Sequence, residues 1–192
     1  MADQVRVLTP ARFAQGFSYA EYLNQVETNR DQFESNYATM ALTEEDKQFF
    51  AALGRKVANL NVLVIAEDWC PDVYTNLPIL MRIAESAGNM QIRIFPRDKN
   101  LDLMNDYLTN GNMSIPAIVF FDDRWQEIGR FIERPVAATK FLVDTRNELA
   151  NSGLSQEEQM KELRRRFRDA RDSFRQETVR EIRQVLEKVA GR

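Results

Sequence analysis

Helical spacing of apolar residues dominates the chain before residue 60. Aromatic and aliphatic side chains recur there every three or four positions, which predicts two or three amphipathic helices. Thr9-Pro10 indicates a helix start, because threonine can cap the first turn and proline needs no N–H donor in it. Thr43-Glu44-Glu45-Asp46 resembles a capping box and predicts another start. We therefore interpret residues 1–56 as an N-terminal helical extension.

The period changes in the centre of the chain. Residues 60–66 form a short, continuous apolar run rich in β-branched side chains, which predicts a strand covered on both faces. The segments that follow predict a helix over 72–87, a strand over 90–95, a short helix over 101–108, strands over 117–121 and 125–131, and a helix over 135–149. This order indicates an α/β domain with one antiparallel hairpin, which we assign to residues 57–151.

Residues 152–192 return to helical spacing. Apolar steps of three and four from Met160 to Phe174 predict one amphipathic helix of about 30 residues, capped by Ser155. A helix of this length needs a surface that covers its apolar stripe, because propensity alone does not stabilise it. A second copy of the chain is the partner that we favour, giving a homodimer through the C-terminal helix. The alternative surface is the aromatic stripe of the N-terminal helices, formed by Phe13, Phe17, Tyr22 and Phe33.

Composition restricts the chemistry of these 192 residues. The chain has no histidine, which excludes Ser-His and Cys-His nucleophiles, imidazole bases and histidine-bound metals. One cysteine closes no intramolecular disulfide and builds no thiolate zinc site, and a lone thiol fits a reducing compartment. No apolar run approaches the roughly 20 residues of a membrane span. We therefore expect a cytoplasmic protein with no cofactor, no metal and no membrane partner.

The basic run Arg164-Arg165-Arg166 in the tail suggests phosphate binding. Acidic residues are interleaved with it, however, so that Glu162 and Arg166 stand four positions apart, as do Arg165 and Asp169, and Arg168 and Asp172. This spacing is typical of ion pairs on a solvated helix surface. The interpretation that we favour is a solvated face without a nucleic-acid partner.

Cys70 is the residue with the clearest potential for chemistry. It lies shortly after the buried strand and at the start of the following helix, whose unpaired N–H groups and dipole favour a thiolate. Glu67, Asp68 and Asp72 place negative charge nearby, which opposes ionisation, so the balance depends on geometry. We interpret Asp68 and Asp72 as a solvated acidic rim and expect Cys70 to be partly exposed. The alternative is an inert, small buried hydrophobe.

Three motifs together resemble the thioredoxin superfamily. They are Trp69-Cys70-Pro71 at a strand-helix junction, Pro78 inside the following helix, and Ser114-Ile115-Pro116 before a strand. The resemblance covers about residues 57–150 and is strongest to a bacterial branch with a single cysteine, here in Trp69-Cys70-Pro71-Asp72-Val73. It implies a three-layer fold around a central mixed sheet and a cis peptide bond before Pro116. It also implies that Cys70 is catalytic and that substrate binds at Trp69, Pro71, Ile115 and Pro116.

Two departures from the family pattern limit the implied reaction. Val73 occupies the position of the resolving cysteine, so the dithiol motif is degenerate. Val64 occupies the position of the buried acid that serves the resolving thiol. The resemblance therefore implies monothiol exchange at Cys70 with a disulfide-containing protein or a small thiol, and resolution by an external thiol. The alternative is a non-catalytic module that binds peptide or protein on a degenerate thioredoxin scaffold.

Overall fold

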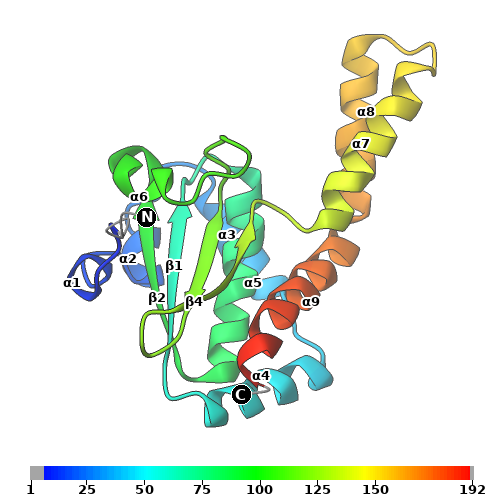
Figure 1. The fold of residues 1–192 in the computed structure, drawn as a ribbon. Coiled ribbons are helices and arrows are strands. Elements are labelled where there is room, and N and C mark those ends of the chain that lie inside the picture. Colours follow the sequence, from blue (N-terminus) through cyan, green and yellow to red (C-terminus); the bar gives the residue numbers. More distant parts are fainter. Residues whose placement is uncertain (1–6, 191–192) are drawn as a thin grey trace.

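The computed structural model describes residues 7–190, and a four-stranded mixed sheet forms its centre (Figure 1). The strands are β1 (Leu60–Ala66), β2 (Met90–Pro96), β3 (Ala117–Phe121) and β4 (Glu127–Ile132), in the order β2-β1-β3-β4. Strand β1 pairs in parallel with β2 and antiparallel with β3, which continues into the β3-β4 hairpin. All residues of β1 are buried, as its continuous apolar run predicts.

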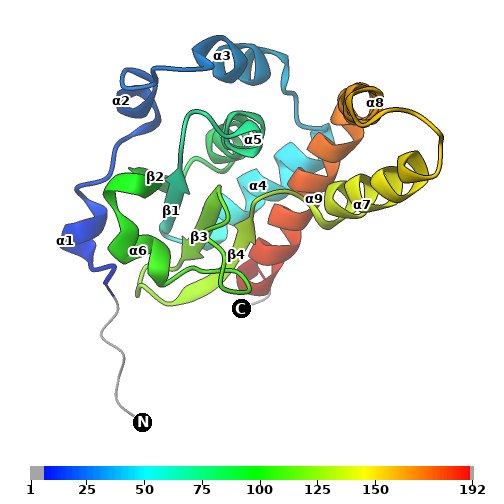
Figure 2. The ribbon, with the colours of Figure 1, turned by 90° about the horizontal axis from the view of Figure 1, so that it is seen from above.

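Helices cover both faces of the sheet, which confirms the predicted α/β fold. Helices α5 (Pro71–Ala87) and α9 (Arg171–Ala190) lie on one face, and α1 (Pro10–Phe13) and α6 (Leu101–Asn105) lie on the other (Figure 2). A short 3-10 turn, Arg97–Lys99, connects β2 to α6. The strand β1 stands between these helical layers, so the residue that follows its carboxyl end is placed at the edge of the core.

The N-terminal segment contains four helices within the described residues, more than the two or three predicted. They are α1, α2 (Tyr19–Leu23), α3 (Arg30–Thr39) and α4 (Glu44–Lys56). Thr9 and Thr43 cap α1 and α4, as predicted. Between α1 and α2 the helical spacing is interrupted, because Phe17 is extended and exchanges backbone hydrogen bonds of 2.9 and 2.8 Å with Ile94.

Two boundaries in the centre differ from the prediction. Strand β4 begins at Glu127 and not at Trp125, whose φ of 61° belongs to the turn. The Trp125 ring instead packs edge-on against Phe13, with 5.0 Å between the ring centres, and so contacts α1. Helix α6 ends at Asn105, earlier than predicted.

The C-terminal segment is helical but is not one continuous helix. Helix α7 (Val136–Ala150) and α8 (Gln156–Asp169) form a hairpin that projects from the sheet, and α9 then returns across β4 and α5 (Figure 1). The chain changes direction at Ala170 because α8 packs against α7 whereas α9 packs against the body of the protein. Val179, Ile182 and Leu186 of α9 are buried, at 1%, 0% and 0% exposure.

The surface that covers α9 therefore belongs to the same chain. It consists mainly of β4 and α5, and not of the aromatic stripe Phe13, Phe17, Tyr22 and Phe33. A homodimer through the C-terminal segment would have to use the α7-α8 hairpin instead.

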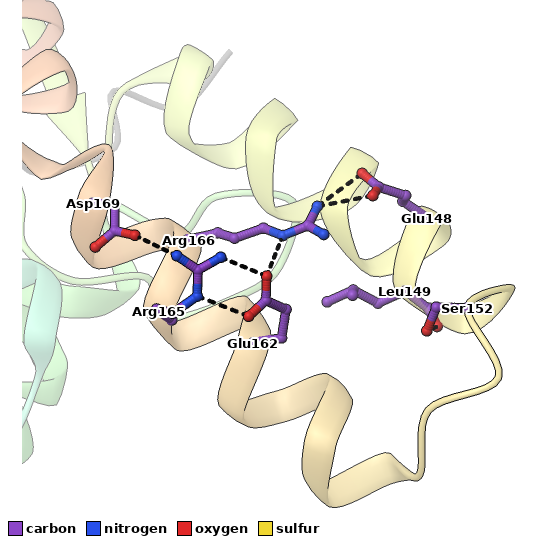
Figure 3. A network of polar contacts seen from close by, with 7 residues as sticks. All are labelled: Glu148, Leu149, Ser152, Glu162, Arg165, Arg166 and Asp169. Carbon is purple, nitrogen blue, oxygen red and sulfur yellow. Dashed lines mark hydrogen bonds and ion pairs between the residues drawn. The ribbon is translucent and has the colours of Figure 1, made fainter.

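Ion pairs cover the surface of α8, and one of them joins α8 to α7 in the hairpin (Figure 3). Arg166 of α8 contacts Glu148 of α7 at 2.9 Å and Glu162 at 2.8 Å. Arg165 contacts Glu162 at 2.7 Å and Asp169 at 2.8 Å. The predicted pairs Glu162–Arg166 and Arg165–Asp169 are thus confirmed, whereas the predicted Arg168–Asp172 pair is wrong for the described residues, because α8 ends before Asp172. A complete capping box at Ser155 fixes the start of α8. Among residues 7–190, no helix has the length and apolar character needed to cross a membrane.

Candidate functional site

Cys70 is the N-cap residue of α5, and residues 67–69 separate it from Ala66 at the carboxyl end of β1. The residue is only 7% exposed, so the prediction of a partly exposed cysteine is wrong. The Ile115 backbone covers the thiol, whose Sγ donates to the Ile115 carbonyl oxygen at 3.6 Å. Cys70 nevertheless lines an open cavity of about 480 Å³, so the sulfur is recessed beneath a surface depression.

The cavity brings together most of the residues that the sequence nominates. Trp69, Pro71 and Ile115 line it together with Cys70, and Trp69 is 50% exposed at its rim. The Ile115–Pro116 peptide bond is cis, and Pro116 is buried beside the cavity and does not line it. The Pro116 carbonyl oxygen accepts the N–H of Glu133 at 2.8 Å, which ties the loop to the residue after β4.

Burial raises the pKa of the Cys70 thiol above its ordinary value. The Val73 N–H at the helix start favours the thiolate and offsets part of this effect, whereas the Asp72 carboxylate adds to it. The Arg134 guanidinium lowers the pKa by the smallest of these contributions. The thiol is therefore predominantly protonated at neutral pH, and desolvation outweighs the helix terminus.

The two carboxylates beside Cys70 do not form a solvated rim. The Asp72 side chain is 14% exposed and accepts a 3.1 Å hydrogen bond from Arg134 Nε. Burial raises the pKa of Asp72 to about 6 despite this arginine, so the carboxyl group titrates close to neutrality. Asp68 accepts the N–H groups of Glu27 and Thr28 at 2.7 and 3.1 Å, and thus fixes the α2-α3 loop.

Sequence reasoning missed Arg134 and Arg97 at this site. Arg134 lies 62 residues from Asp72, so no local spacing connects them. Its position between Glu133 and Pro135 gave only the weak signal of a charged residue before a helix start. Arg97 follows β2, and its guanidinium lies 5.1 Å from the centre of the Trp69 ring, within cation-π distance.

The two degenerate positions are both apolar and buried. Val73 is 0% exposed one turn after Cys70, and Val64 is 0% exposed in the middle of β1. Ile94 and Ile118 flank Val64 on the neighbouring strands, so no proton acceptor occupies this place. In residues 7–190 no group of three or more acidic or cysteine side chains is arranged to hold a metal ion.

A thiol at the start of a helix, facing a cis-proline loop at the edge of a mixed sheet, defines a thioredoxin-like protein. The family profile described as Thioredoxin matches residues 16–150, and the chain belongs to this family. The match begins within the segment that we interpret as the N-terminal extension. No curated protein matches the sequence.

Two solved structures share the fold along almost the whole chain. A protein of unknown function from Pseudomonas aeruginosa is 20% identical, with a TM-score of 0.67 and coverage of 96% of this chain and 98% of its own. An HIV epitope scaffold is 18% identical, with a TM-score of 0.66 and coverage of 94% and 98%. At these identities the likeness describes the fold alone.

Proposed function

We propose that the protein carries out monothiol thiol-disulfide exchange through Cys70. The observation that carries the proposal is the position of this thiol, at the start of α5 and 3.6 Å from the carbonyl oxygen that precedes the cis Pro116 bond. Trp69, Pro71 and Ile115 line the cavity beside the thiol and would hold the substrate strand, and Pro116, buried beside the cavity, would support the loop that contacts it. A reduced lone thiol suits a reducing compartment such as the cytoplasm.

The reaction balances without a second cysteine in the chain. The Cys70 thiolate attacks one sulfur of a substrate disulfide, forms a mixed disulfide and releases the other sulfur as a thiolate. A low-molecular-weight thiolate then attacks the substrate sulfur of the mixed disulfide and regenerates the Cys70 thiolate. The external thiol is now bound to the substrate sulfur in a new mixed disulfide, and a second external thiolate attacks the external sulfur of this disulfide and releases the second substrate thiolate. Two external thiols therefore supply the two electrons and leave as their own disulfide. Cys70 returns unchanged at the end of each cycle.

A second candidate function is a binding module on the same scaffold. The burial of Cys70 and its raised pKa favour this alternative, because a protonated, recessed thiol is a poor nucleophile. In that case the cavity at Trp69 and Ile115 holds a peptide without turnover. Reduction of insulin disulfides with a small monothiol as donor separates the two, since only exchange requires Cys70 and disappears in Cys70→Ser.

The alkylation rate of Cys70 should rise with pH along a curve shifted to higher pH than that of an unfolded cysteine. The reason is burial, which raises the pKa of the thiol and keeps the thiolate fraction at pH 7 below the roughly 3% of a free cysteine. Iodoacetamide labelling followed by mass spectrometry measures this directly, because the chain has no other thiol. Protein unfolded in urea is the control, and an equal or lower midpoint in the folded protein contradicts the expectation.

Val73→Cys should convert the site into a dithiol site. The introduced thiol lies one turn along α5 from Cys70, where it can attack the mixed disulfide and release the reduced substrate. The prereduced variant should reduce about one insulin disulfide per chain without any external thiol, whereas the unmodified chain should stop at a mixed disulfide. Adding Cys70→Ser to the variant is the control. Absence of reduction in a variant whose new pair oxidises would favour the binding module.

A further inference from the structure

A second cavity of about 430 Å³ adjoins the cavity that Cys70 lines, which we call the thiol cavity. The second cavity lies between the α7-α8 hairpin and the first turns of α5. We propose that this groove binds an acidic peptide segment with apolar side chains, on a partner protein whose disulfide is presented to Cys70. The proposal deepens the proposed function and rests on it for the disulfide that the segment carries. We name the cavity the hairpin groove. Its apolar lining includes Leu142, Met160, Leu163, Phe167 and Phe174.

Part of the apolar lining of the hairpin groove is open to solvent. Phe174 lies 5.1 Å from Phe167 and 5.4 Å from Phe141, measured between ring centres, and these rings are only partly buried. Met160 at the same surface is 45% exposed. An aromatic cluster that the chain leaves partly uncovered is a surface that apolar side chains of a partner can bury.

The charge around the hairpin groove selects an anionic partner. Four exposed arginines line it, and within the described part of the chain none of their side chains has an ionic partner: Arg146, Arg164, Arg168 and Arg171. Their neighbours Arg165 and Arg166 behave differently, because both are paired with carboxylates (Figure 3). The one acidic residue in the lining, Asp72, is already paired with Arg134. The groove therefore presents uncompensated positive charge around an apolar floor.

The hairpin groove continues into the thiol cavity. Both cavities are lined by Pro71, Asp72, Arg134, Leu142 and Phe167, so one extended segment can occupy both. A second copy of this chain fits less well, since its one cysteine is itself recessed and only 7% exposed. A fatty acid supplies a single carboxylate for four arginines and brings no sulfur. An acidic peptide supplies several carboxylates, apolar side chains and a disulfide on one backbone.

Fluorescence anisotropy with a cysteine-free peptide tests the groove. The probe is a short fluorescein-labelled peptide in which glutamate alternates with leucine or phenylalanine, and the comparison peptide has lysine in place of glutamate. We expect the acidic peptide to bind the full chain about tenfold more tightly, with an affinity that falls as salt is added. Equal affinities for the two peptides, or an affinity independent of salt, would overturn the proposal.

Charge reversal locates the binding surface. Arg168→Glu and Arg171→Glu should each weaken the acidic peptide about fivefold to tenfold. Arg124→Glu is the matched control, because Arg124 is exposed in the β3-β4 turn, at the opposite end of β3 from Pro116, and its reversal changes the net charge equally. A control variant that weakens binding as much as the groove variants would contradict the assignment. Displacement of the peptide by an equal concentration of dodecanoate would also contradict the assignment, because it would indicate a fatty-acid site. A dimer, measured by light scattering, that dissociates when the peptide binds would contradict it as well, because the groove would then hold a second copy of the chain.

The two proposals can fail separately. The cysteine-free peptide should bind Cys70→Ser as it binds the original chain. If the original chain exchanges disulfides but does not bind the peptide, only the hairpin-groove proposal is refuted. Binding without any exchange at Cys70 refutes only the proposed function. If both proposals hold, a mixed disulfide built on the acidic peptide should exchange with Cys70 several times faster than one built on the lysine peptide. Equal rates would contradict the proposal that the hairpin groove presents the disulfide to Cys70.

Discussion

Gly54→Ala should destabilise the protein by about 3 kcal/mol, although it improves the intrinsic helix propensity of α4. The cause is the close approach of α4 to the end of α5. A Cβ atom at position 54 would lie 1.8 Å from the carbonyl oxygen of Ala87 and 2.9 Å from its carbonyl carbon. These are backbone atoms, which a rotamer change cannot move aside, so the two helices must separate and loosen the contact that positions α5.

Urea unfolding followed by circular dichroism measures this effect. Helix propensity alone would make alanine more stable than glycine by about 1 kcal/mol, so the sign of the change distinguishes the two arguments. Gly153→Ala is the matched control: its added Cβ meets nothing within 4 Å, and its φ of +74° costs alanine only about 1 kcal/mol. A Gly54→Ala chain as stable as the original would mean that α4 does not pack against α5 as described.

The order of elements between residues 60 and 150 could be predicted because their local patterns are strong. The continuous apolar run of β1 is buried on both faces, and α5 spans Pro71–Ala87, one residue longer than the predicted range of 72–87. The break in the tail could not be predicted in the same way. The steps of three and four continue through Ala170, and only the separate surfaces offered by α7 and by β4 divide the helix there.

The candidate site likewise combines residues that are adjacent in sequence with contacts between residues far apart in the chain. Trp69, Cys70 and Pro71 are adjacent in sequence, so their placement together follows from one strand-helix junction. The state of the thiol depends instead on Ile115, 45 residues away, which covers it. Likewise the charge of Asp72 depends on Arg134, a contact that no spacing rule connects. Desolvation of these groups comes from tertiary packing, and it decides the direction of their pKa shifts.

Ile182→Ala should lower the free energy of unfolding by about 3 kcal/mol, because Ile182 is 0% exposed and its truncation leaves a cavity. For a chain of this size that loss corresponds to a fall in the melting temperature of roughly 6 to 12 °C. The position is informative because Ile182 lies on α9, in the C-terminal segment through which the sequence predicts a dimer. In the fold described, α9 is covered by β4 and α5 of the same chain.

The dependence on protein concentration separates the two origins of this stability. An intramolecular contact makes the melting temperatures of the original chain and of Ile182→Ala independent of concentration, whereas a seam between two copies makes the melting temperature rise with concentration. Met160→Ala is the control on the same C-terminal segment, since Met160 is 45% exposed and its truncation should change stability by no more than about 0.5 kcal/mol. A concentration-dependent melting temperature that Ile182→Ala abolishes would show that α9 is a subunit interface and not the cover of the sheet.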